Sequence, residues 1–276
     1  MRSRWQRCGL TLAIIAAAAF STAAGARTSD SGQPPATTSP AALPLESDGT
    51  LSAGTNAARA VKRHPGSAVQ LSNETTLTRW AYAQREAVIR TQPAAGSGKV
   101  ARLGYTSNEH VRQVYILLSG VTDASGHVWF KVRVPGRPNG RVGWTKAGGL
   151  YRPRIVHSQI VVDRGTLHAT MYRNGQAVWD APVGVGKPST PTPGGHYVIE
   201  HRAGPIFGPA YGTHILFTNA FSTLENWPGG GMVGMHGTNE PGLVPGRPSH
   251  GCIRLHNEDI NRLYKLVRVG TPLRIL

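Results

Sequence analysis

The sequence contains few cysteines, no internal repeat and no long hydrophobic run. Its 276 residues include only Cys8 and Cys252, so a framework of disulfides is excluded as the basis of the fold. The longest apolar run covers residues 10–20, which is well short of the roughly 20 residues that span a bilayer. The absence of a repeat of fixed period argues against a solenoid.

Acidic residues are also scarce. The chain carries 14 Asp and Glu against 30 Lys and Arg, which gives a formal net charge of +16, and its hydrophobic content of 39% is typical of a globular protein. Such a surplus attracts polyanions, including nucleic acid, anionic lipid headgroups and acidic wall polymers. Because the basic residues are spread along the chain and form no long block, they indicate a solvated basic surface and not a binding arm.

The first 26 residues have the layout of a secretory signal peptide. Three arginines precede the apolar run, and small residues follow it, so we expect cleavage after Ala26. The predicted mature protein lies outside the cytoplasm, in the extracellular space, the cell wall or the periplasm, with no membrane association. Cleavage removes Cys8 and leaves 27 Lys and Arg against 14 acids. Export also excludes nucleic acid as the natural partner.

Composition divides the remaining chain into three parts. Residues 27–70 are rich in Ser, Pro and Thr, and they predict a disordered tether because they contain too few large apolar side chains to offset chain entropy. Residues 71–150 show short apolar alternations between turn residues, as in HVWFKVRV, which is typical of half-buried strands. The segment GHVWFKVRVPGRPNGRVGWTK resembles the final strands of bacterial SH3-like domains. That resemblance implies a small SH3-like β-barrel.

Residues 155–276 predict a second, larger β domain. A meander begins the domain, with a hairpin turn at Asn174 and Gly175, and further short strands are bounded by Gly or Pro. One amphipathic helix follows Cys252, with Asn257 as its expected cap. Its apolar positions recur at helical spacing: Ile260, Leu263, Tyr264 and Val267. The predicted fold class is mainly β, a sandwich with one helix plus the small barrel.

Cys252 has the surroundings of a nucleophile. A thiol that attacks a carbonyl needs a base to remove its proton and backbone amides to stabilise the oxyanion that forms. His236 is a candidate base, and Gly251 lets the backbone approach a ligand because it has no Cβ. The amides around Cys252 are candidate oxyanion donors.

Two other interpretations of Cys252 stay open at this point. A lone cysteine in an exported protein can be a buried, inert core residue. It can also bind zinc together with three histidines, since His236, His250 and His256 complete a set of four ligands. We expect His256 to be a surface residue at the start of the helix and not a catalytic one.

The stretch HGTNEPGLVPGRPSHGCIRLHN resembles the signature of the L,D-transpeptidase (YkuD-type) catalytic domain, in which a His-Gly-Thr element precedes a Ser-His-Gly-Cys element. The resemblance extends to IVVDRGTLHATMYRNGQAV, VGKPSTPTPGGHYVI and NEDINRLYKLVRVGTPLRIL, and so covers about residues 155–276. Only 12 residues separate His236 from Ser249, slightly fewer than is typical, which indicates a trimmed loop.

The resemblance implies a role for each motif residue. Cys252 is the nucleophile, His236 accepts and later donates its proton, and His250 helps to polarise the site. Gly251 and Cys252 supply oxyanion amides. The remaining motif positions are expected to hold the site or to bind substrate: Gly237, Thr238, Ser249 and Arg254.

The resemblance also implies a reaction. We expect peptidoglycan cross-links between diaminopimelate residues, formed through an acyl-thioester with release of D-Ala and sensitive to carbapenems. Donor and acceptor stem peptides are the expected partners, anionic wall polymers are further candidates, and no metal or organic cofactor is expected. The alternatives are an L,D-carboxypeptidase that transfers the same acyl group to water, and a non-catalytic module that binds the cell wall.

Overall fold

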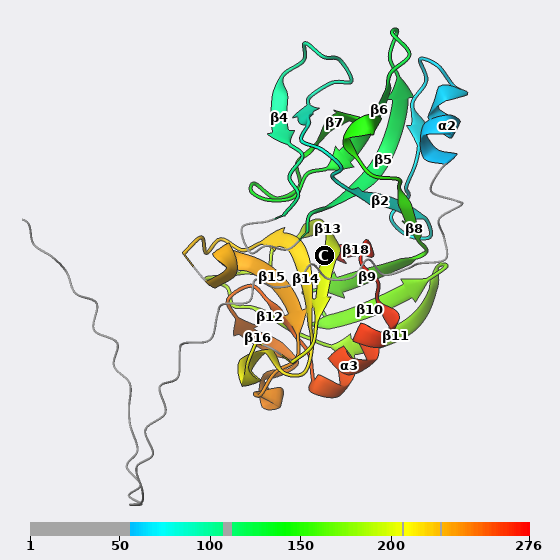
Figure 1. Ribbon diagram of the computed structural model, residues 1–276. Coiled ribbons are helices and arrows are strands. Elements are labelled where there is room, and N and C mark those ends of the chain that lie inside the picture. The colour runs from blue at the N-terminus through cyan, green and yellow to red at the C-terminus, as the bar shows by residue number, and fades with distance from the viewer. Residues whose placement is uncertain (1–55, 107–111, 206, 227) are drawn as a thin grey trace, which may run out of the picture. The chain divides into compact units, whose positions relative to one another are not determined.

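The computed structural model describes residues 56–106, 112–205, 207–226 and 228–276 (Figure 1). The predicted signal peptide, Cys8 and the first part of the predicted tether, residues 27–55, lie outside the described residues. No helix in the described ranges is both long and apolar enough to cross a bilayer.

The last part of the predicted tether is folded. Helix α2 (Asn56–Lys62) and strand β1 (Val69–Gln70) lie within residues 56–70. The side chains of Ala57 and Val61 are four positions apart on one helix face, and both are buried in a hydrophobic core. The prediction of disorder up to residue 70 is therefore wrong for this part, because two small apolar residues suffice to dock a short helix.

The first sheet is antiparallel and has the strand order β4-β3-β7-β6-β5-β2-β8, with β1 added beside β5. Its core lies on one face and includes Ile89, Tyr115, Leu117, Phe130 and Val132. The short helix η1 (Ala147–Gly149) follows its penultimate strand. The strands are β2 (Thr78–Tyr82), β3 (Val88–Arg90), β4 (Lys99–Arg102), β5 (Val114–Thr122), β6 (Val128–Arg133), β7 (Val142–Lys146) and β8 (Arg154–Val156).

The second sheet has ten strands in the order β11-β10-β9-β18-β13-β14-β15-β17-β12-β16. Together the two sheets confirm the predicted mainly β, sandwich-like fold class. The strands are β9 (Ser158–Asp163), β10 (His168–Arg173), β11 (Gln176–Pro182), β12 (Gly184–Gly186), β13 (Gly195–Ala203), β14 (Ile215–Phe221), β15 (Met232–His236), β16 (Gly246–Ser249), β17 (Ile253–Arg254) and β18 (Pro272–Ile275).

Short helices join several of these strands. They are η2 (Pro209–Tyr211), η3 (Pro228–Gly231) and η4 (Pro241–Leu243). The longer helix α3 (Asn257–Leu266) follows Cys252, as predicted, and buries Ile260 and Leu263 in the core of the second sheet. His256, and not Asn257, occupies the N-cap position, and the Asn257 side chain is used for contacts described below.

The two sheets share buried contacts. A small hydrophobic cluster joins Trp80 and Ile116 of the first sheet to Val198 of the second. The backbone N–H of Val114 donates a hydrogen bond of 3.0 Å to the carboxylate of Glu200, which is 2% exposed. Since an unpaired buried carboxylate is costly, this contact fixes β5 against β13.

Candidate active site

Cys252 lies on a tight turn between β16 and β17, which we call the catalytic turn (residues 249–252). Gly251 has a φ of +126°, a conformation that residues with a Cβ rarely adopt. A Cβ at this position would also lie 2.7 Å from the Cβ of Ser222. Glycine is therefore required here both for the turn and for its close approach to the neighbouring chain.

Two buried hydroxyl groups hold the catalytic turn. The Ser249 hydroxyl accepts a hydrogen bond of 3.1 Å from the Gly251 N–H and donates one of 2.6 Å to the Cys252 carbonyl. From the other side, Thr192 donates a hydrogen bond of 2.8 Å to the Gly251 carbonyl and accepts one of 2.8 Å from Gly186. Every hydroxyl in this set is satisfied by backbone, so the turn is rigid before substrate arrives.

The structure gives Ser249 a role in holding the catalytic turn, and its predicted contact with substrate stays a prediction. The residue is 2% exposed, and its hydroxyl is used within the turn. The Gly251 amide donates to the Ser249 hydroxyl in this structure, and the roles of the Gly251 and Cys252 amides as oxyanion donors stay predictions. The Gly234 N–H also points at the sulfur, at 3.5 Å from Sγ.

The Cys252 sulfur lies against the backbone of β15. Besides the contact from Gly234, the S–H lies 4.0 Å from the carbonyl oxygen of Met232. Burial raises the pKa of the Cys252 thiol above its usual range, while the Gly234 N–H and the charge of Arg254 oppose that shift. In the free enzyme the group is accordingly a thiol at neutral pH.

His236 ends strand β15 and is 4% exposed. Its Nδ1 lies 2.6 Å from the carbonyl oxygen of Gly237. Because a carbonyl can only accept, Nδ1 carries the proton, and Nε2 is left with a free lone pair. Burial lowers the pKa of His236 to about 4, against the opposing effect of the Gly237 hydrogen bond. At neutral pH the imidazole is therefore a neutral base with its proton on Nδ1.

Strand pairing brings the end of β15, which carries His236, beside the strand that directly follows Cys252. Strands β15 and β17 are parallel, with Met235 opposite Ile253 and His236 opposite Arg254. Among the described residues, no hydrogen bond joins the Cys252 sulfur to the imidazole. The resting site thus holds a neutral thiol and a neutral imidazole, and proton transfer has to accompany attack.

Arg254 lies opposite His236 across the paired strands β15 and β17, and its positive charge adds to the lowering of the His236 pKa and opposes the rise of the Cys252 pKa. Its guanidinium donates a hydrogen bond of 2.6 Å to the Glu240 carboxylate. Arg254 therefore has an acidic partner within the chain, and its predicted contact with a substrate carboxylate stays a prediction. His250 is half-buried on the same turn as Cys252.

Gly237 and Thr238 are buried behind the site. The Asn257 amide group accepts a hydrogen bond of 3.2 Å from the Thr238 N–H and donates one of 3.1 Å to the Thr238 carbonyl. It also accepts a bond of 3.3 Å from the Thr213 N–H. Thr238 thus anchors the end of β15 to helix α3, and the predicted contact of Gly237 and Thr238 with substrate stays a prediction.

Three residues near the site were missed by the sequence analysis. The Tyr211 ring packs on the His236 ring with a centroid distance of 4.8 Å, and burial raises the pKa of the Tyr211 hydroxyl, with the Cys252 sulfur in its ionised form as the smaller cause. Ser222 packs on Gly251, and Thr192 holds the catalytic turn. Only Thr192 had a signal, since it lies in the quoted segment VGKPSTPTPGGHYVI.

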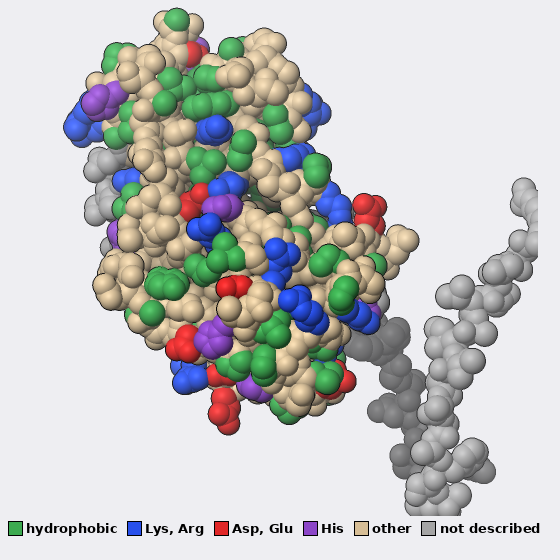
Figure 2. Space-filling view, turned by 180° about the vertical axis from the view of Figure 1, so that it is seen from behind, with side chains coloured by type: hydrophobic (Ala, Val, Ile, Leu, Met, Phe, Trp, Pro, Cys, Tyr) green, Lys and Arg blue, Asp and Glu red, His purple; other side chains and the backbone are tan. Residues whose placement is uncertain are grey.

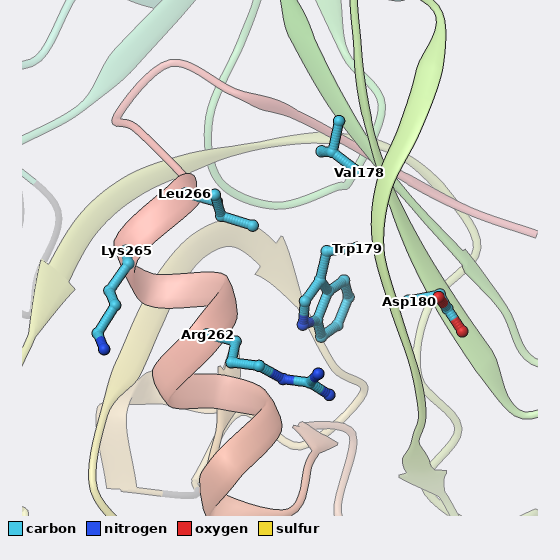
Figure 3. A pocket seen from close by; sticks show the side chains of 6 residues that line it. All are labelled: Val178, Trp179, Asp180, Arg262, Lys265 and Leu266. Carbon is cyan, nitrogen blue, oxygen red and sulfur yellow. The ribbon is translucent and has the colours of Figure 1, made fainter.

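The zinc interpretation finds no support in the described ranges, where no three His, Cys, Asp or Glu residues are placed to hold a metal ion. His256 is turned toward Asp259, at 3.3 Å, and toward the Pro241 carbonyl. A separate pocket lies between β11 and α3, with Trp179 and Arg262 on facing walls (Figure 3). None of the predicted site residues lines it.

Comparison with known proteins decides the family. Residues 157–275 match the family model YkuD, described as an L,D-transpeptidase catalytic domain. The chain is 32% identical over 127 residues to a putative L,D-transpeptidase YkuD from Bacillus licheniformis, covering 46% of this chain and 70% of the relative. The corresponding protein of Bacillus subtilis is 33% identical over 127 residues, covering 46% and 71%. The chain belongs to the YkuD-type L,D-transpeptidase family.

This L,D-transpeptidase is also 31% identical over 144 residues to a probable L,D-transpeptidase YbiS from Escherichia coli, covering 46% of this chain. The alignment covers 47% of that relative, about half its length. The family assignment makes the chain an L,D-transpeptidase enzyme with peptidoglycan as its substrate class. The matched residues include His236 and Cys252, whereas the SH3-like character of residues 71–150 stays a prediction.

Proposed function

We propose that this L,D-transpeptidase is an exported enzyme that cross-links two diaminopimelate residues of peptidoglycan through an acyl-thioester on Cys252. The observation that carries the proposal is the buried imidazole of His236, whose Nδ1 is fixed by the Gly237 carbonyl, on the strand that pairs with the one directly after Cys252. This arrangement supplies a nucleophile and a base of defined tautomer.

The first half of the reaction forms the thioester. The Cys252 sulfur attacks the carbonyl that follows the L-centre of diaminopimelate in the donor stem, and its proton passes to Nε2 of His236. The bond to the terminal D-Ala then breaks, and the leaving amine takes the proton from His236. The N–H groups of Cys252 and Gly234 are the donors near the developing oxyanion.

The second half transfers the acyl group. The side-chain amine of a second stem attacks the thioester and loses a proton to His236, which returns that proton to the departing sulfur. No metal or organic cofactor takes part, because the donor peptide bond supplies the free energy. If water replaces the amine, the same steps give L,D-carboxypeptidase activity.

Product analysis tests the reaction. The purified full chain is incubated with disaccharide-tetrapeptide, and the products are identified by mass spectrometry. We expect release of D-Ala and a cross-linked dimer, both absent for Cys252→Ala and for Cys252→Ser. Shortened stems without dimer, in the presence of excess acceptor, would identify a carboxypeptidase. No turnover and no carbapenem adduct on Cys252 would instead favour a wall-binding module.

We also propose that the basic surface holds the enzyme on an anionic wall, together with the SH3-like domain. Lys and Arg side chains are spread over both halves of the visible face, with acidic ones interspersed (Figure 2), and Lys and Arg outnumber Asp and Glu by 30 to 14 in the whole chain. Long-range attraction of this kind weakens with salt. Retention of the full chain on isolated walls should therefore fall between low and high ionic strength, and salt-independent retention would contradict the proposal.

A further inference from the structure

The chain segment beside the catalytic turn is held by residues that lie outside the range matched by the YkuD family model, residues 157–275. This flanking segment, residues 221–226 and 228–231, joins β14 to β15. Its second and last residues are joined to each other, since the Ser222 N–H donates a hydrogen bond of 2.8 Å to the Gly231 carbonyl. Two side chains from the β6–β7 loop of the first sheet, Arg137 and Asn139, form hydrogen bonds with the first residues of the flanking segment.

Arg137 binds three backbone carbonyls of the flanking segment. Its guanidinium donates hydrogen bonds of 2.8 Å to Gly230, 2.8 Å to Ser222 and 3.3 Å to Leu224. The same group lies 4.8 Å from the centroid of the Phe221 ring. Only the planar guanidinium offers several donors in a fixed geometry, so a lysine could not replace this set of contacts. The Arg137 side chain is 31% exposed, which leaves it partly shielded from water.

Asn139 extends the end of β14 as a neighbouring strand would. Its amide nitrogen donates a hydrogen bond of 2.7 Å to the Phe221 carbonyl, and its amide oxygen accepts one of 3.1 Å from the Phe221 N–H. Both backbone groups of one residue are thus paired by one side chain. The two loop residues together fix Phe221 and Ser222 through the backbone and without regard to side-chain identity.

Two contacts lead from these residues to the catalytic thiol. Phe221 is paired with Met232, whose carbonyl lies 4.0 Å from the Cys252 sulfur. Ser222 packs against Gly251, where even one added carbon would collide with it. A shift of Phe221 or Ser222 would therefore move the wall against which both the turn and the sulfur rest.

We propose that Arg137 and Asn139 are positioning residues for the L,D-transpeptidase reaction, which they support by fixing the flanking segment against Cys252. The inference rests on the proposed function only for its effect on turnover. The first sheet then has a part in catalysis besides any attachment to the wall. This part requires no contact between the first sheet and the substrate.

The test compares Arg137→Ala, Arg137→Lys, Asn139→Ala and a matched control, Arg152→Ala, which removes an exposed arginine between η1 and β8. We expect kcat to fall about tenfold for Arg137→Ala and Asn139→Ala with little change in KM, since small misplacements near reacting atoms are costly. Arg137→Lys should retain an intermediate activity, and Arg152→Ala should match the parent chain.

A second readout does not depend on transpeptidation. Loosening the flanking segment admits water to the sulfur, so the pH profile of Cys252 alkylation by iodoacetamide should shift to lower pH in Arg137→Ala. Hydrogen exchange in residues 222–231 should accelerate, while exchange in α3 stays unchanged. A parent chain without turnover would refute the proposed function, yet these two measurements would still decide the role of Arg137.

Two results would overturn the inference. One is that Arg137→Ala behaves like Arg152→Ala in kcat, alkylation and exchange. The other is that activity falls only in proportion to a lower melting temperature while the alkylation profile stays that of the parent chain. In that case Arg137 would stabilise the fold without positioning the thiol.

Discussion

The two sides of the active site are built differently. On the inner side, Ser249, Thr192 and Asn257 hold the catalytic turn and the end of β15 with buried hydrogen bonds that all lie within the family-matched residues. On the outer side, the flanking segment is held by Arg137 and Asn139 from another sheet. The comparison indicates that the chemistry is intrinsic to the matched domain, while the geometry of one wall depends on its neighbour.

The largest loss of activity is expected when the Cys252 thiol or the His236 base is replaced, because both sides of the active site hold these two groups in place. Cys252→Ala should reduce D-Ala release to background, and His236→Asn should reduce it about 10²–10⁴-fold, because general-base catalysis is lost. Both rates are measured by mass spectrometry of the products. A His236→Asn rate within threefold of the parent would exclude the imidazole as the base.

Substitutions on the inner side of the active site should lower stability and turnover more than substitutions on the outer side. Thr192→Val removes both hydrogen bonds of the hydroxyl and leaves the Gly251 carbonyl and the Gly186 N–H unpaired in a buried site. Such groups cost about 1–3 kcal/mol each, so the free energy of unfolding should fall by about 2–6 kcal/mol in denaturant titrations. Turnover should fall more than in Arg137→Ala. The exposed Thr75→Val is the control and should change neither quantity.

The buried imidazole of the inner side also predicts a pH dependence of stability. Burial lowers the pKa of His236 to about 4 from 6.5, so between these values the unfolded chain binds a proton that the folded chain does not. The free energy of unfolding should therefore fall by about 3 kcal/mol from pH 6.5 to pH 4. His236→Asn should flatten this slope, whereas exposed His64→Asn should keep it. Equal slopes in all three chains would show that His236 is not the cause.

The smallest effect on stability is expected for the exposed ion pair between Glu240 and Arg254. The Glu240 carboxylate that binds Arg254 is 52% exposed, so this ion pair should contribute less than about 1 kcal/mol. Glu240→Gln should leave the melting temperature nearly unchanged. The same substitution frees the Arg254 guanidinium. If Arg254 binds a substrate carboxylate, KM for the stem peptide should therefore fall. A KM equal to that of the parent would remove Arg254 from the predicted substrate contacts.

The sequence predicted most of the fold because the governing signals are local. Helix α3 and the β9–β11 meander follow from apolar spacing and from a turn at Asn174 and Gly175. The segment at residues 56–70 was missed because its apolar face consists only of small residues in an Ala- and Gly-rich context. Short amphipathic signals of this kind depend on the partner that they pack against.

The candidate site could be predicted in its residues but not in their orientation. A motif identifies Ser249 and Thr238 as important, yet it does not tell whether their side chains face the substrate or the protein interior. The contacts of Arg137 and Asn139 join positions more than 80 residues apart, through loops whose sequence shows no periodicity. Nothing in the chain near residue 137 indicates such a partner.

Gly270 gives the fold a practical consequence. It has a φ of +88°, and the indole of Trp80 occupies the space where a side chain would stand. A fragment that begins at residue 155 would lose this indole. Val198 would then be exposed to solvent as part of a hydrophobic surface. A protein truncated to its catalytic domain for crystallisation or inhibitor screening should therefore aggregate, so the first sheet should be retained.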